Sequence, residues 1–245
     1  MLPSPMIGVI SRLRSQSSMS ANACSQVDLI SSGLALRGAA EIGYHPDMSN
    51  RIVTIALATV LLAMFFYEIA IGAAGNEVAL LPLGALRTRG WSPVDWWRVL
   101  TFSFLHLNAL HLALNVAGVL WLGGITERRL GPTSLVVLFV MSAIMSGVVG
   151  MLLGPWLPTT GIAFGASGAV FGLLAAALLL VFRYGAGHGT RDRTLRVALM
   201  IGFIAGVTLS LLPGVSFAGH LGGFMSGALI TGLIVRRQGK VPQKS

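Results

Sequence analysis

Charged residues are scarce in this sequence. They make up 10% of its 245 residues, whereas a soluble domain of ordinary composition has about 25%. Hydrophobic residues make up 54%, and they gather in runs of about 20, the length that spans a hydrocarbon core roughly 30 Å thick. This composition excludes an ordinary soluble domain and predicts one multi-pass membrane domain.

Cysteine is nearly absent too. The one cysteine, Cys24, excludes an intramolecular disulfide and gives no sign of redox or thiolate-metal chemistry. Acidic residues number 8 against 17 basic ones, which leaves a net charge of +9. Because the basic residues stand in short clusters beside the apolar runs and form no single stripe, we expect no nucleic-acid partner and interpret them as signals of membrane topology.

Six apolar segments are long enough to cross a bilayer. They are residues 52–72, 107–125, 133–153, 166–182, 195–212 and 215–235. Hydrocarbon offers no partner for backbone N–H and C=O groups, and segments of this length suit helices rather than the short alternating strands of a barrel. We therefore predict an all-α polytopic bundle of six transmembrane helices over residues 51–237. Mobile cytoplasmic tails are expected at residues 1–50 and 238–245.

The basic residues predict the orientation of this bundle. Fourteen of the seventeen lie in the first 51 residues, in two of the turns between segments and after the last segment. Cytoplasmic loops are enriched in Lys and Arg, so both termini are expected in the cytoplasm. Arg87, Arg89 and Arg98 lie in the long first loop, which is expected outside and half-immersed at the interface, with Trp97 and Arg98 anchoring it at the headgroups.

Polar groups are costly inside such segments and are functional candidates by default, and four of them stand out: His111 and Asn115 in the second segment, Ser167 in the fourth and His220 in the sixth. His111 and Asn115 are four residues apart, so they share one helix face. His111, Ser167 and His220 each lie sixteen residues before the first charged residue at the cytoplasmic end of their segment. At about 1.5 Å per residue, we predict one shared layer, about 6 Å below the outer boundary of the hydrocarbon core.

Glycines recur every four residues beside the serine and the second histidine. They are Gly168 and Gly172 in the fourth segment and Gly219, Gly223 and Gly227 in the sixth. Such small-residue faces let helix backbones nearly touch. Close packing of these two helices would bring the Ser167 hydroxyl within hydrogen-bond distance of the His220 imidazole, although the glycines taken alone indicate only tight packing.

Five motifs in a fixed order carry a family resemblance. They are Trp97-Arg98, His106 with His111-Leu-Ala-Leu-Asn115, Glu127-Arg-Arg-Leu-Gly131, Gly165-Ala-Ser-Gly168 and Gly219-His-Leu-Gly-Gly223. Over about residues 52–237, the chain resembles the rhomboid intramembrane serine proteases. Each motif is weak alone, and the set is specific.

The resemblance implies a catalytic dyad of Ser167 and His220. It further implies oxyanion stabilisation or substrate positioning by His111, Asn115 and Gly165, and support from Phe171, Gly168, Gly219 and Gly223. Phe171 stands where the family often has a tyrosine, which preserves the ring but not the hydroxyl. The implied substrate is a transmembrane segment of another membrane protein, cut near its outer end. The implied location is a bacterial plasma membrane, with the active site opening to the outer side.

The chemistry of the residues agrees with a dyad. A serine hydroxyl is a poor nucleophile until a base removes its proton, and His220 is placed to act as that base. The Ser167 N–H, the Asn115 amide and the His111 ring can donate to an oxyanion. No aspartate lies at this depth, and the only carboxylate within a span is Glu68, so packing is expected to orient His220. No cofactor and no metal are expected.

Three alternatives remain open at this point. A rhomboid-like protein that only escorts membrane clients would lack the serine or the histidine, and both are present. A metal site of His106, His111 and His220 would lack the H-E-x-x-H pattern and an accompanying carboxylate. A transporter would carry more intramembrane charges and an inverted repeat. We instead expect His106 to support the first loop or the site's outer edge, and Glu68 to be hydrated or paired at the interface.

Overall fold

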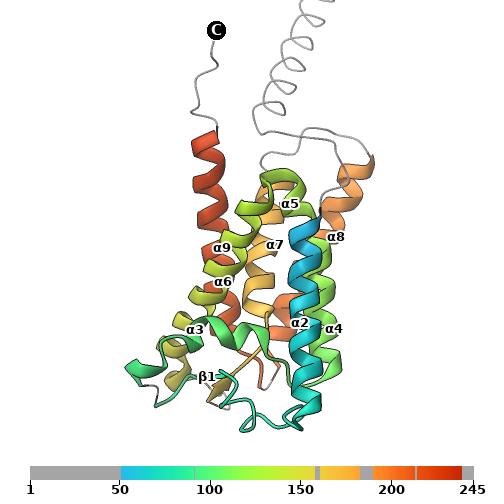
Figure 1. Cartoon of the computed structure of the whole chain (residues 1–245). Coiled ribbons are helices and arrows are strands. Elements are labelled where there is room, and N and C mark those ends of the chain that lie inside the picture. The colour runs from blue at the N-terminus through green and yellow to red at the C-terminus, as the bar shows by residue number, and fades with distance from the viewer. Residues whose placement is uncertain (1–50, 91, 158–160, 183–189, 213, 239–245) are drawn as a thin grey trace, which may run out of the picture.

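A computed structural model of the protein describes residues 51–90, 92–157, 161–182, 190–212 and 214–238 (Figure 1). The expected N-terminal tail, which contains Cys24, lies outside these ranges. So does all but the first residue of the expected C-terminal tail.

The described part of the chain is built mostly of helices. In chain order the elements are α2 (Ile52–Ala70), β1 (Leu86–Arg87), η1 (Pro93–Asp95), α3 (Arg98–Thr101), η2 (Phe102–Phe104), α4 (Ala109–Gly118), η3 (Val119–Gly123), α5 (Gly124–Leu130), α6 (Pro132–Leu153), η4 (Gly154–Trp156), β2 (Ile162–Ala163), α7 (Ser167–Phe182), α8 (Thr190–Ser210) and α9 (Phe217–Gln238). Helices α4 and α5 run on through η3, a single π-helical turn, as one long helix.

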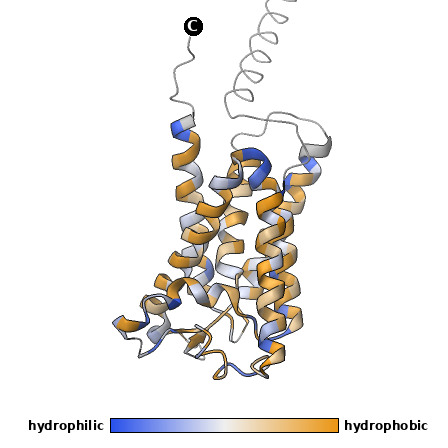
Figure 2. Ribbon diagram, in the orientation of Figure 1, coloured by the Kyte–Doolittle hydropathy of each residue, from blue (hydrophilic) through white to orange (hydrophobic). Residues whose placement is uncertain are grey.

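Among the described residues, five helices are long and apolar enough to cross a membrane. They are α2, the continuous α4–α5 helix, α6, α8 and α9. Helix α7 is equally apolar but has 16 residues. Each of the six predicted segments coincides with one of these helices, so the polytopic helical bundle is confirmed, while five helices rather than six meet the length for spanning. Figure 2 shows hydrophobic residues along the helices and hydrophilic ones mainly at the bundle ends.

Helix α7 is short because the chain enters the bundle in an extended form before it turns helical. Residues Ile162–Ala163 form β2, and the glycines on either side, Gly161 and Gly165, have positive φ values of 83° and 110°. Such φ values are accessible to glycine at little cost. The helix therefore begins only at Ser167, and it runs through the middle of the bundle (Figure 1).

The most extensive helix contacts join α7, α9 and α6. A Cβ atom added at Gly223 would overlap the carbonyl oxygen of Gly168, and one added at Gly227 would overlap that of Gly172. The predicted close approach of these two helices is thus present as backbone-to-backbone contact. Ser146 of α6 covers Gly168 from the other side in the same way.

The loop between α2 and α4 is tied to the segment that precedes Ser167. Strand β1 pairs antiparallel with β2, with Leu86 opposite Ala163. The Arg98 guanidinium forms an ion pair with Asp95 at 2.9 Å and donates hydrogen bonds to the carbonyls of Leu81 and Ala85. Arg98 is therefore turned into the loop, and the expectation that it anchors the loop at the headgroups is wrong, because the loop's own carbonyls and carboxylate provide its partners.

Glu68 is also placed differently from the sequence-based expectation. Its side chain is fully buried, and both carboxylate oxygens accept from the backbone N–H of His106 at 3.2 Å. It is therefore not hydrated at the interface. This carboxylate instead fixes the start of the segment that leads into α4.

A second buried carboxylate, Glu127, lies at the opposite end of the bundle. It accepts from the N–H groups of Val53 and Thr54 at 3.0 and 2.8 Å, and from the Thr54 hydroxyl at 2.6 Å. The first N–H groups of a helix have no partner within the helix. Glu127 thus caps α2 and ties its first turn to α5.

Candidate active site

The Ser167 side chain meets the His220 ring between α7 and α9. Ser167 is the first residue of α7, and His220 lies one turn into α9 and is 8% exposed. The distance from Ser167 Oγ to His220 Nε2 is 2.8 Å. The structure thus brings together, within hydrogen-bond distance, the two residues that the sequence placed at equal depth on separate helices.

Phe171 lies one turn after Ser167 and stacks on the His220 imidazole. The ring centroids are 4.3 Å apart, and the ring planes differ by 11°. The far edge of the phenyl ring contacts α8, where a Cβ added at Gly206 would lie 2.9 Å from Phe171 Cζ. The Phe171 ring therefore sets the plane of the imidazole, and α8 in turn holds the phenyl ring in place.

Sequence analysis missed one partner of this histidine. The hydroxyl of Ser210, at the end of α8, lies 2.6 Å from His220 Nδ1 and is almost fully buried. The expectation that packing alone orients His220 is therefore incomplete. The signal for Ser210 is weak in the sequence because serines occur in several of the helices, and only the rotation of α8 about its axis shows which one faces the ring.

His111 lies against the backbone just before Ser167. A Cβ at Gly165 would lie 2.6 Å from His111 Nε2, so only glycine leaves room for the imidazole here. Gly165 also donates its N–H to the carbonyl of Phe102 at 2.9 Å. These contacts fix the turn that leads into α7 and place the His111 ring two residues from Ser167.

Asn115 is buried one turn after His111. Its amide nitrogen donates to the carbonyl of His111 at 3.0 Å. Because a primary amide carries two N–H donors, this bond accounts for one of them. Among the predicted donors, His111 is therefore close to the serine turn, and Asn115 is held on the same helix face.

The glycines predicted to support the site have separate functions in packing. Gly168 and Gly223 bring the backbones of α7 and α9 together, as described above. Gly219 donates its N–H to the Ser216 hydroxyl at 3.1 Å, which satisfies one free N–H in the first turn of α9. The helix that carries His220 is therefore both capped and pressed against the helix that carries Ser167.

The His106 ring packs against the His111 ring. The two rings meet edge to face with centroids 5.2 Å apart, and His106 is fully buried. Burial, with a smaller contribution from nearby His111, lowers the pKa of His106 to about 3, so this imidazole is neutral at physiological pH. Within the described residues, no three His, Cys, Asp or Glu side chains gather as a ligand set for a metal ion.

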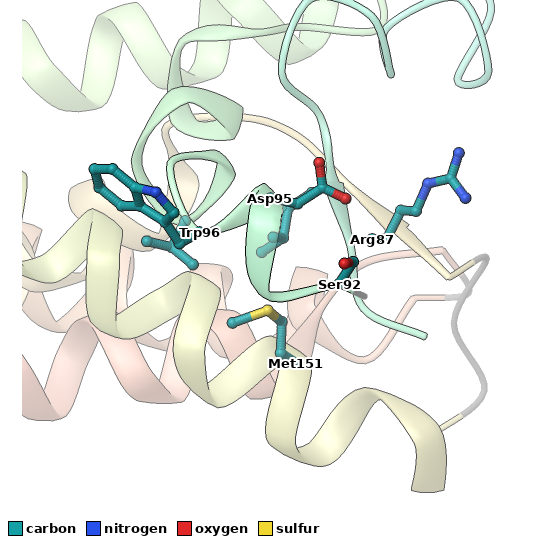
Figure 3. Close-up of a pocket in the computed structure, with 7 residues that line it drawn as sticks. Arg87, Ser92, Asp95, Trp96 and Met151 are labelled. Carbon is teal, nitrogen blue, oxygen red and sulfur yellow. The ribbon is translucent and has the colours of Figure 1, made fainter. Parts of the chain in front are cut away.

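One small cavity among the described residues lies away from this site. Its volume is about 190 Å³, and it is lined by Leu86, Arg87, Ser92, Asp95, Trp96, Val99 and Met151. Met151 points from α6 toward the loop that carries Ser92 and Asp95 (Figure 3). Because Asp95 is already paired with Arg98, the cavity offers mainly apolar surface and no nucleophile beyond the loop hydroxyl.

The geometry around Ser167 suits nucleophilic chemistry. A hydroxyl in contact with an imidazole can be deprotonated as it attacks, and the same imidazole can then protonate a leaving group. A helix N-terminus also presents free N–H groups and partial positive charge to a developing anion. Ser167 occupies such a terminus.

Known proteins that resemble this chain share one family. The family model of the Rhomboid domain matches residues 93–237, more than half of the chain. Rhomboid-like protease 3 of Toxoplasma gondii is 31% identical over 182 residues, which cover 73% of this chain and 67% of that protein. Rhomboid protease GlpG of Enterobacter sp. (strain 638) is 33% identical over 142 residues, 58% of this chain and 46% of the relative. Rhomboid protease GluP of Bacillus subtilis (strain 168) is 27% identical over 172 residues, 70% of this chain. The chain spans less than half the length of these last two relatives.

Proposed function

The chain belongs to the rhomboid family of membrane proteases, and we propose that it is an intramembrane serine endopeptidase that acts through a dyad of Ser167 and His220. The observation that carries this proposal is the 2.8 Å contact between Ser167 Oγ and His220 Nε2. The contact lies inside an apolar bundle, where a hydroxyl and an imidazole at hydrogen-bond distance form a nucleophile with its base.

The reaction proceeds in two halves. Ser167 Oγ attacks the carbonyl carbon of the scissile peptide bond while His220 Nε2 takes the hydroxyl proton. The tetrahedral intermediate collapses as His220 returns that proton to the leaving amine, which departs and leaves an acyl ester on Ser167. Water then attacks the ester with His220 again as base, and the amino-terminal fragment of the substrate leaves with a new carboxyl group as Ser167 regains its proton.

Three donors stabilise the oxyanion in this scheme. They are the backbone N–H of Ser167 at the start of α7, the His111 ring beside Gly165 and the Asn115 amide. These donors stabilise the transition state more than the bound substrate, because the carbonyl oxygen becomes negative only as the transition state forms. Losing one such donor typically lowers the rate by about 100- to 1,000-fold.

The substrate class follows from the location of the dyad. The helices are apolar along their length, as those of a protein that meets transmembrane segments within the bilayer would be. Ser167 follows β2 by four residues, so the dyad lies toward the end of the bundle that carries the β1–β2 pair (Figure 1). The clustered arginines, including Arg128 and Arg236, lie at the other end, which we assign to the cytoplasm. The protein thus cleaves transmembrane segments near their outer ends.

The test is cleavage of a reporter transmembrane substrate by purified protein in liposomes. Wild type should cut the reporter, while Ser167→Ala and His220→Ala should lose cleavage and remain folded and inserted. A fluorophosphonate should label wild type at Ser167, and a chelator should leave cleavage intact. Normal turnover by Ser167→Ala would refute the dyad, and loss of activity to a chelator with recovery on adding zinc would favour a metal enzyme.

A further inference from the structure

The hydrogen bonds around Ser210 determine which nitrogen of His220 carries the proton. The Ser210 hydroxyl lies 2.7 Å from the carbonyl oxygen of Gly206, one turn earlier on α8, and 2.6 Å from His220 Nδ1. Both distances are those of good hydrogen bonds. One hydroxyl therefore serves two neighbours at once.

Only one arrangement of protons satisfies both contacts. A carbonyl oxygen has no hydrogen to give, so the Ser210 hydroxyl must donate its single proton to Gly206. Toward His220 the same oxygen can then only accept. His220 Nδ1 must therefore carry the hydrogen, and the neutral ring has its lone pair on Nε2, the nitrogen that faces Ser167 Oγ.

We infer that Ser210 is a positioning residue that holds His220 in the Nδ1–H tautomer, so that Nε2 is always free to accept the Ser167 proton. This inference rests on the proposed function, since it assigns Ser210 a part in that same reaction. In proteases with a three-residue arrangement, an aspartate performs this task. Here the acceptor is a neutral hydroxyl that is itself polarised by the Gly206 carbonyl.

A neutral hydroxyl as the partner of His220 suits the apolar surroundings. Ser210 is 3% exposed and lies between apolar helices, where an unneeded carboxylate would be expensive to bury. When His220 becomes an imidazolium during the reaction, Nδ1–H remains the donor and Ser210 the acceptor. No proton therefore moves between Ser210 and His220 at any stage, and this hydrogen bond needs no rearrangement during the reaction.

The contact also distinguishes Ser210 from an ordinary serine of a membrane helix. The hydroxyl of such a serine donates to a carbonyl of its own helix and has no partner on a neighbouring helix. Thr208, two residues earlier on α8, does so: its hydroxyl donates to the Ile204 carbonyl at 2.9 Å and its side chain is exposed. Thr208→Ala therefore removes the same kind of local bond without touching the ring.

The experiment compares wild type, Ser210→Ala, Ser210→Thr and Thr208→Ala. Ser210→Ala should lower kcat by about 10- to 100-fold with little change in KM, and should slow fluorophosphonate labelling of Ser167 to the same degree. Ser210→Thr, which keeps the hydroxyl, should recover most of this loss, and Thr208→Ala should behave as wild type. Unchanged kcat in a folded Ser210→Ala protein would overturn the inference.

A direct readout needs no substrate. In protein labelled with ¹⁵N-histidine, with the His220 signals identified by their loss in His220→Ala, wild type should show a protonated Nδ1 and an unprotonated Nε2. Ser210→Ala should show a mixture of tautomers. A neutral wild-type ring protonated at Nε2 would refute the inference even if the protein is an active protease. Absence of cleavage by wild type would instead refute the proposed function and leave the tautomer measurement intact.

Discussion

The His220 ring is held from two sides by very different helix contacts. On one side, α9 and α7 touch backbone to backbone at Gly223 and Gly227, and half of the apolar stretch of α9 is buried. On the other side, α8 contacts the ring through Ser210 and supports Phe171 at Gly206, and 11% of its apolar stretch is buried. The orientation of the imidazole that we infer from Ser210 thus depends on a mostly exposed helix.

The difference separates two requirements of the proposed chemistry. The distance from Ser167 Oγ to His220 Nε2 depends on the close α7–α9 contact, which tolerates no added atoms. In this proposal the tautomer and plane of the ring depend on α8, most of which is exposed. Damage to the first contact should therefore remove both fold and activity, whereas damage to the second should lower turnover in a protein that is still folded.

The largest effect is expected from breaking the α7–α9 contact. Gly227→Ala places a methyl group on the carbonyl oxygen of Gly172, and overpacking of this kind costs about 3 kcal/mol of stability. We expect a lower melting temperature and near-complete loss of cleavage. Gly232→Ala on the same helix is the control, since a Cβ there meets nothing within 4 Å. Equal behaviour of the two variants would show that the contact does not limit the fold.

The next effect concerns the oxyanion donors, which act on the same side as the nucleophile. Asn115→Ala and His111→Ala should each lower kcat by about 10- to 1,000-fold, the range allowing for replacement by water or the remaining donors. If both residues only join helices, melting temperature should fall by the equivalent of about 1 kcal/mol while turnover of the folded fraction stays the same. Turnover and melting temperature measured on one preparation separate these outcomes.

A smaller effect is expected from disturbing the α8 side. Gly206→Ala would place a Cβ 2.9 Å from Phe171 Cζ, so the phenyl ring must shift away from its stack on His220. We expect kcat to fall about 10-fold, the equivalent of one weak contact, with no loss of melting temperature because alanine favours helix over glycine by up to about 1 kcal/mol. A fall in melting temperature as large as that of Gly227→Ala would abolish the contrast between the two sides.

The smallest effect on turnover is expected at the far end of the bundle. Glu127→Gln retains the shape of the side chain but replaces one acceptor oxygen with an NH2 donor, so at least one of the three hydrogen bonds from Val53 and Thr54 is lost and the others weaken. Stability should fall by about 1–2 kcal/mol, while kcat of the folded protein should remain that of wild type. A selective loss of kcat in this variant would indicate that α2 and α5 influence the site over a distance.

Much of the architecture follows from the sequence for a local reason. Hydrocarbon forces each apolar segment into a helix, so the helical bundle was predictable from hydropathy alone. The spacing of Gly168 and Gly172, and of Gly223 and Gly227, likewise indicates which helix faces can approach, because small residues lie on one face by the helical repeat. Ser167 and His220 were predicted to lie at equal depth by counting residues, and they lie within hydrogen-bond distance.

Other features depended on how the helices are rotated and joined. The inward turn of Arg98 depends on carbonyls of the folded loop, and the burial of Glu68 depends on the His106 N–H that the same loop presents. Ser210 and Gly206 are ordinary residues of an apolar helix until α8 turns them toward His220 and Phe171. Hydropathy and glycine spacing are properties of one segment at a time, whereas a hydrogen bond between two helices exists only when both rotations and their crossing are set. The sequence by itself therefore determined which segments become helices and which residues share a depth, and only the tertiary structure decided which hydroxyl holds the histidine.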